Sequence, residues 1–203
     1  LRNLEVEMGA SPFAEGSCLI STGRTRVLCT ASILDEVPPW REKSGKGWVT
    51  AEYNMLPRAT HTRSRRERNR ISGRTQEIQR LIGRALRSVV DMGVISGKTV
   101  IVDCDVIQAD GGTRCASICG AMMALSDAAH YLNDNGKLES WPIKHWLAAV
   151  SVGHVDGRAL LDLDYNEDST ADVDMNVIFG NMSKMIDIMK NTALTLLKTS
   201  INK

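Results

Sequence analysis

The sequence Gly111-Gly112-Thr113-Arg114 lies between a strand-like apolar pattern and a helix-like one. Glycines allow a tight turn and a close approach of the backbone to a ligand, and the N–H groups that open a helix attract anions. Thr113 can cap the helix and contact the anion, and Arg114 adds a bidentate donor. These residues predict an anion site, although an ordinary glycine turn with a surface arginine fits the spacing equally well.

A second group of chemically useful residues is acidic and precedes or lies on a predicted strand over residues 172–179. Alternation along this strand divides its side chains between two faces. The polar face takes Asp172, Asp174 and Asn176, and the core face takes Val173, Met175 and Val177. Asp174 then shares a side with the preceding turn, which carries Asp168. Two converging carboxylates could hold Mg²⁺ or Mn²⁺ through oxygen ligands; an exposed acidic strand face is the alternative.

Arginines concentrate between residues 58 and 74, where seven occur with a single acidic residue, Glu67. Arg74 lies in the first turn of a predicted helix, where a positive charge opposes the helix dipole, although Glu77 compensates nearby. The whole chain has a net charge of +1, yet this segment is basic and the C-terminal part is rich in Asp. The uneven charge favours a polyanionic ligand and a metal. A solvated arginine-rich loop is the competing interpretation.

Composition limits the class of protein that can present these residues. The 203 residues are 43% hydrophobic and 24% charged, which excludes disordered and fibrous classes. No apolar run is long enough to cross a membrane, and no secretory signal is visible. A chain that begins at Leu1 predicts a natural N-terminus upstream. The five cysteines are without metal-ligand spacing, so we expect buried, reduced thiols in a cytoplasmic protein.

Hydrophobic periodicity predicts the elements that must position the candidate residues. Strands are expected over residues 17–21, 26–33, 48–54, 99–107, 147–154, 158–164 and 172–179, and helices over residues 74–92, 114–132 and 186–197. The second helix is rich in small residues, which allow close packing, so we expect it at the centre of the core. The order predicts an α+β fold with a mixed sheet packed against helices, in a single domain that spans residues 1–203.

Longer stretches of the sequence also match a known pattern. They comprise residues 47–58, 61–63, 73–84, 103–114, 167–169 and 174–177. In this order they resemble the bacterial ribonuclease PH family, from about Phe13 to Val177. Polynucleotide phosphorylase and exosome ring subunits are similar only in the fold and in the Gly-Gly-Thr-Arg feature.

The resemblance implies a phosphate-dependent 3′→5′ exoribonuclease, a tRNA nucleotidyltransferase that trims the 3′ end of precursor tRNA. Inorganic phosphate would be the co-substrate and nucleoside 5′-diphosphates the products, and the reverse reaction would add nucleotides to RNA 3′ ends. It also implies the ribosomal-protein-type β-α-β superfold and a cytoplasmic homo-hexamer, a trimer of dimers, that binds RNA but neither DNA nor a membrane.

The resemblance also implies roles for residues at matching positions. Phosphate would be held by Arg74, Gly112, Thr113 and Arg114. Mg²⁺ or Mn²⁺ binding and acid–base catalysis would fall to Asp168 and Asp174. RNA would be bound by Arg58, Arg63, Arg65, Arg66, Arg68 and Arg70.

The sequence departs from the family pattern at three places. Cys115 stands where the family more often has Thr, the arginine segment is slightly short, and a glycine- and glutamate-containing stretch is missing after Ile186. The two shorter stretches are explained either by loops left out of this sequence or by true deletions. Two rival functions are weaker: a non-catalytic ring subunit would lack part of the arginine and aspartate set, and a small-molecule kinase would need a longer, Ser/Gly-rich phosphate loop.

Overall fold

The computed structural model describes residues 1–67 and 70–180, and its larger sheet has five strands. These strands are β1 (Leu4–Met8), β2 (Gly16–Thr22), β3 (Thr25–Leu34), β4 (Trp48–Met55) and β5 (Thr99–Gln108), in the order β1-β2-β3-β5-β4. Only β4 and β5 are parallel, and the helix α2 (Gly73–Val89) connects them as a β-α-β unit. The mixed sheet confirms the predicted fold class.

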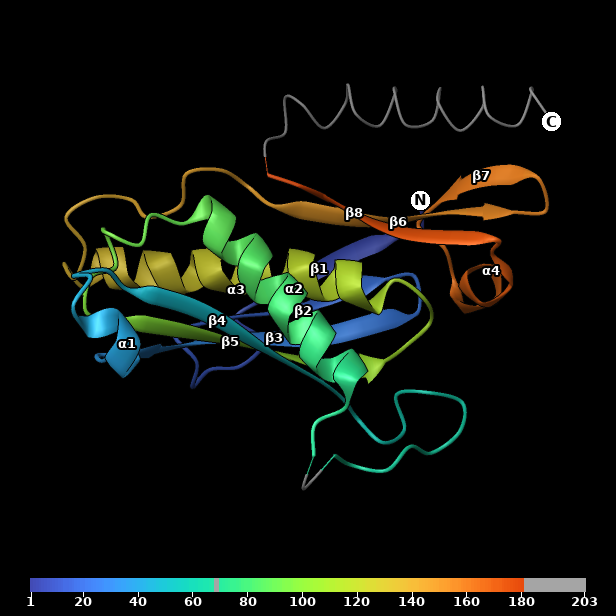
Figure 1. Ribbon diagram of the computed structural model, residues 1–203, viewed down its shortest axis with the longest axis horizontal. Coiled ribbons are helices and arrows are strands. Elements are labelled where there is room, and N and C mark those ends of the chain that lie inside the picture. The colour runs from blue at the N-terminus through green and yellow to red at the C-terminus, as the bar shows by residue number, and fades with distance from the viewer. Residues whose placement is uncertain (68–69, 181–203) are drawn as a thin grey trace.

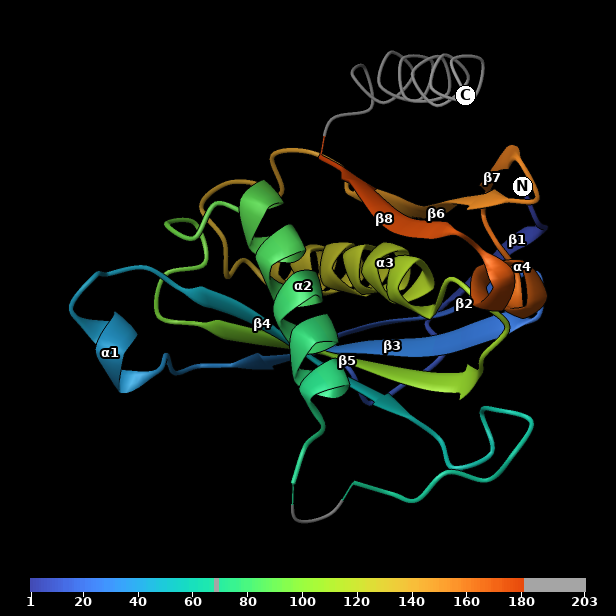
Figure 2. The ribbon, with the colours of Figure 1, turned by 45° about the vertical axis from the view of Figure 1, so that its right-hand side comes forward.

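A second, three-stranded antiparallel sheet lies on the other side of the helices (Figure 1). Its strands are β6 (Ala148–Val155), β7 (Arg158–Leu161) and β8 (Val173–Phe179). The helix α3 (Thr113–Asp134) contacts β2, β3 and β5 on one side and β6 on the other. Figure 2 shows α2 and α3 between the two sheets. None of the described helices is long and apolar enough to cross a membrane.

Small residues bring α3 close to the larger sheet. A Cβ at Gly120 would lie 2.7 Å from the Cys29 sulfur, and a Cβ at Gly16 would lie 2.2 Å from the carbonyl oxygen of Ala124. Any larger side chain would therefore separate the layers. The expectation that this helix is central to the core is confirmed. The cysteines are free and four of the five are buried, as expected.

Three elements of the structure are absent from the sequence-based prediction: β1, α1 (Pro39–Glu42) and α4 (Tyr165–Thr170). The sequence of β1 alternates apolar Leu4, Val6 and Met8 with Glu5 and Glu7, and the sequence analysis missed this period-2 signal, although all five residues are exposed in the structure. The side chains of Asp164 and Glu167 form a reciprocal capping box at the start of α4. Hydrophobic periodicity alone does not detect such a polar helix start, so the sequence analysis predicts a turn for this segment. The last predicted helix, residues 186–197, lies outside the described residues, as does the departure after Ile186.

One prediction about β8 is wrong. Val173 and Met175, expected in the core, are 54% and 42% exposed in the structure. The polar face instead turns toward α3, where the Cys115 thiol donates to the Asn176 side-chain oxygen at 3.2 Å. This inversion occurs because the helix-facing side of the smaller sheet carries polar groups that line a cavity.

Candidate active site

A cavity of about 400 Å³ lies where α2, α3, α4 and β8 converge. Its lining comprises Met55, Thr60, His61, Thr62, Arg74, Ala109, Gly111, Gly112, Thr113, Arg114, Ser151, Tyr165, Asp168, Asp174 and Asn176. We call Arg74, Gly112, Thr113 and Arg114 the basic wall, and Asp168 and Asp174 the acidic wall. The structure thus brings the predicted phosphate-binding and acidic residues to one cavity.

The diglycine turn, formed by Gly111 and Gly112, opens α3 in a left-handed conformation, with φ angles of 73° and 64°. Gly112 is the N-cap residue and Thr113 is already helical, so the expectation that Thr113 caps the helix is wrong. The Thr113 hydroxyl instead accepts a hydrogen bond from the Tyr53 hydroxyl at 3.2 Å. Within residues 1–67 and 70–180, the N–H groups of both glycines have no hydrogen-bond partner. Successive N–H groups of this kind form an anion-binding concavity.

Arg114 is held by an acidic residue of the neighbouring helix. Its Nη2 donates to a Glu77 carboxylate oxygen at 2.9 Å. Glu77, expected to compensate the charge of Arg74, therefore pairs with Arg114, while Arg74 stays exposed at the cavity. The ion pair fixes the direction of the Arg114 guanidinium across the start of α2.

Glu67, the acidic residue of the arginine segment, has a structural role that the sequence analysis missed. One of its carboxylate oxygens accepts from the Ser72 N–H at 3.1 Å and the other from the Thr75 hydroxyl at 3.2 Å. The hydrogen bonds from Ser72 and Thr75 lower the pKa of Glu67. Ser72 itself caps α2 by accepting from the Thr75 N–H. Together they anchor the helical turn that carries Arg74; the available signal was a serine just before the helical pattern.

The acidic wall is built from the short helix α4 and the strand β8. Burial raises the pKa of the Asp168 carboxyl, and the negative charge and close approach of Asp174 raise it further. Arg114 and Arg74 act in the opposite direction. The two carboxylates therefore crowd each other, and either a proton or a bound cation would relieve that repulsion.

The acidic wall fits a magnesium ion whose remaining ligands are waters and substrate phosphates. The described residues hold no group of three or more His, Cys, Asp and Glu side chains able to enclose a metal. Two carboxylates are nevertheless sufficient for Mg²⁺, which keeps several waters and binds substrate phosphates.

The arginine segment lies on the loop between β4 and α2, which projects away from the sheets in Figure 1. The exposed arginines described there are Arg58, Arg63, Arg65, Arg66 and Arg70, whereas Arg68 lies outside the described residues. The loop reaches the cavity through Thr60, His61 and Thr62. The His61 ring packs edge-on against the Tyr165 ring of α4, with centroids 5.8 Å apart. The loop therefore adjoins both the cavity and the acidic wall.

A cavity that sets arginines and backbone N–H groups against paired carboxylates is typical of enzymes that transfer phosphoryl groups. Comparison with known proteins defines the class further. Residues 1–130 match the 3′ exoribonuclease family, domain 1, and residues 145–199 match domain 2 of that family. The chain is also 55% identical over 190 residues to ribonuclease PH of Maricaulis maris (strain MCS10), covering 93% of this chain and 80% of that protein. The chain belongs to the ribonuclease PH family and is a phosphorolytic 3′ exoribonuclease that uses phosphate as a substrate.

Solved structures share the fold. Rice (Oryza sativa) Rrp46 is similar with a TM-score of 0.73 and 20% identity, covering 91% of this chain and 76% of that chain. The Archaeoglobus fulgidus exosome with RNA bound to the active site is similar with a TM-score of 0.71 and 20% identity, covering 98% and 88%. These similarities confirm the fold class; the assignment of residues 1–203 to a single domain stays a prediction.

Proposed function

We propose that the 400 Å³ cavity is the site of phosphorolysis, with the basic wall holding the attacking phosphate and the acidic wall facing the scissile bond. The convergence of both walls on one cavity carries this proposal. Backbone N–H groups at the start of α3 and two arginines, Arg74 and Arg114, provide fixed donors for phosphate oxygens. Such preorganised donors stabilise the charge that develops in phosphoryl transfer without a nucleophilic side chain.

The reaction forms one P–O bond and breaks another. A phosphate oxygen attacks the phosphorus of the last phosphodiester, the bond to the preceding 3′-oxygen breaks, and the terminal nucleotide leaves as its 5′-diphosphate. The departing 3′-oxygen requires a proton. Asp168 is suited to donate it, because burial and the charge of Asp174 raise the pKa of its carboxyl and so favour its protonated form.

Asp174, together with an oxygen of Asp168, would hold Mg²⁺ or Mn²⁺. When bound, the ion supplies neutralisation of negative charge on the scissile phosphate. This assignment is supported by the mutual repulsion of the two carboxylates, which a cation relieves.

The proposed substrate is the 3′ end of precursor tRNA, and the proposed assembly is a cytoplasmic homo-hexamer, a trimer of dimers. The arginine segment would bind RNA phosphates, and neither DNA nor a membrane is an expected partner. Family membership and the fold shared with exosome proteins support the RNA substrate and a ring. The exposed arginines beside the cavity support a path for the RNA along the arginine segment.

The test is product analysis of a 3′-labelled oligoribonucleotide incubated with the protein and Mg²⁺, with and without phosphate. We expect nucleoside diphosphates only when phosphate is present. Sulfate in place of phosphate serves as the control for ionic strength and should give no product. Equal release of nucleoside monophosphates without phosphate would identify a hydrolase and contradict the proposal.

A further inference from the structure

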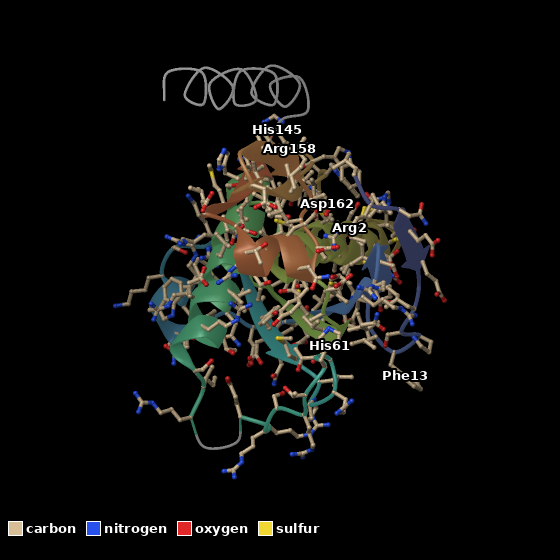
Figure 3. The ribbon with its side chains drawn as sticks, turned by 90° about the vertical axis from the view of Figure 1, so that its right-hand side faces the viewer. Arg2, Phe13, His61, His145, Arg158 and Asp162 are labelled. Atoms are coloured by element: carbon tan, nitrogen blue, oxygen red, sulfur yellow. The ribbon has the colours of Figure 1, made fainter. Side chains whose placement is uncertain are left out.

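Arg2 and Asp162 are 160 residues apart in the sequence, yet they form an ion pair beside the start of α3 (Figure 3). The Arg2 guanidinium donates to one Asp162 oxygen at 2.6 Å, and the Arg2 backbone N–H donates to the other at 2.7 Å. Their side chains are only 17% and 9% exposed. A pair buried to this extent requires good geometry to offset its desolvation, so its position is well defined.

The same guanidinium also contacts the diglycine turn. Its Nη1 donates to the Asp110 carbonyl oxygen at 2.6 Å, and its Nη2 lies 2.9 Å from the point where a Cβ of Gly112 would be. Gly112 lines both the 400 Å³ cavity and a second cavity of about 270 Å³, which Arg2 and Asp162 also line. The turn therefore separates Arg2 from the site of phosphorolysis.

Further contacts hold the same turn. The Thr25 hydroxyl donates to the Gly111 carbonyl oxygen at 2.6 Å and accepts from the Asp110 N–H at 2.9 Å. Arg24 pairs with the Asp110 carboxylate at 3.0 Å, but its side chain is 68% exposed. The carbonyl oxygens of Asp110 and Gly111 are thus fixed. Glycines with positive φ lose much conformational freedom when they are ordered, so the direction of the neighbouring N–H groups depends on these anchors.

We propose that Arg2, paired with Asp162, is a positioning residue for the attacking phosphate. It holds the carbonyl that precedes the diglycine turn, so that the N–H groups of Gly111 and Gly112 stay directed for anion binding. Arg2 itself does not line the cavity of the proposed phosphate site. This inference rests on the proposed function, because it assigns to the turn the binding of phosphate.

The test compares two Michaelis constants in Arg2→Met, measured with the full chain. We expect the KM for phosphate at saturating RNA to rise about tenfold, since the loss of one hydrogen bond to a charged group is of this order. The KM for RNA at saturating phosphate should stay within about twofold, because the proposed RNA contacts lie on the arginine segment and not on the diglycine turn. Arg24→Met is the matched control: it removes an exposed ion pair to the same Asp110, so its phosphate KM should change less than about twofold.

Two further variants separate positioning from a general loss of structure. Arg2→Lys keeps the charge and folds more readily, but one ammonium group cannot reproduce the planar fork that reaches both Asp162 and the Asp110 carbonyl, so its phosphate KM should also rise. In Arg2→Ala, added methylguanidinium should lower the phosphate KM again without affecting the wild type.

An unchanged phosphate KM in Arg2→Lys and Arg2→Met, or an equal rise of both Michaelis constants, would overturn the proposal. If the wild type itself released no nucleoside diphosphate in response to phosphate, the proposed function would be wrong, whatever the Arg2 variants do.

Discussion

The two walls of the cavity rest on very different supports. The basic wall lies at the N-terminal ends of α2 and α3, whose inner residues Ile78, Ile82 and Ile118 are fully buried. The acidic wall lies on α4, which has no buried residue, and on the exposed start of β8. In the proposed mechanism, core packing would therefore fix the position of phosphate, whereas the chemistry of the acidic wall would depend on the interaction between two carboxylates.

The largest expected effect is that of Asp174→Asn. The change preserves the shape of the side chain but removes a charge, so folding should survive while turnover falls by about 10²–10⁴, the range for a lost group in acid–base or metal catalysis. Raising Mg²⁺ or substituting Mn²⁺ should restore part of the rate, because the defect is one of metal affinity. Asp168→Asn should recover less than Asp174→Asn does, since it removes the proposed proton donor as well as one metal ligand, and added metal restores only the second. A folded Asp174→Asn that turns over RNA at the wild-type rate would refute the role of the acidic wall.

Arg114→Ala should have the next largest effect. The loss of a donor to the attacking phosphate corresponds to about 3 kcal/mol of transition-state stabilisation, or roughly 10² in kcat/KM. RNA affinity without phosphate should change little. Glu77→Gln is the control, because it breaks the ion pair while it keeps Arg114, and its loss should be much smaller. If RNA affinity fell as far as the rate in Arg114→Ala, Arg114 would be an RNA contact instead.

The pH dependence of stability sharpens the comparison between the walls. Because the folded state raises the pKa of Asp168, the stability associated with protonated Asp168 is present below the unfolded pKa and is lost as pH rises through the folded value. Asp168→Asn should therefore be more stable than the wild type at neutral pH, by no more than about 1 kcal/mol since solvent screens the interaction. The difference should vanish in acid, as measured by urea unfolding at several pH values. A variant less stable at neutral pH would contradict the repulsion.

The smallest effect concerns the arginine segment. Neutralising Arg63 and Arg65 should reduce the slope of log affinity for single-stranded RNA against log salt by about 1.4, at roughly 0.7 for each phosphate contact. Arg158, on β7 and far from this loop in Figure 3, provides the control: Arg158→Gln should leave the slope unchanged. An unchanged slope in the double variant would leave the segment as a solvated loop or a subunit contact.

The sequence allows the parts of the site that are contiguous or periodic to be predicted. The diglycine turn and the start of α3 form one uninterrupted stretch, and Asp174 follows from alternation along a strand. Sequence reasoning missed the hydrogen bonds that Glu67 accepts from Ser72 and Thr75, because Glu67 lies in a segment without hydrophobic periodicity. It also missed the contact of Arg2 with Asp162, because that contact depends on tertiary packing between segments 160 residues apart. It also inverted the environment of Val173, since periodicity divides a strand into two faces but does not determine which face is covered.

The proposal that the two walls have separate roles is tested most directly by comparing kcat and the KM for phosphate in Arg74→Lys and Asp174→Asn. Arg74→Lys removes a planar donor from the basic wall, so we predict a phosphate KM raised about tenfold or more, with a smaller change in kcat. Asp174→Asn should lower kcat while its phosphate KM stays within about twofold of the wild type. The same pattern of change in both variants, with phosphate KM and kcat altered alike, would contradict separate roles for the two walls.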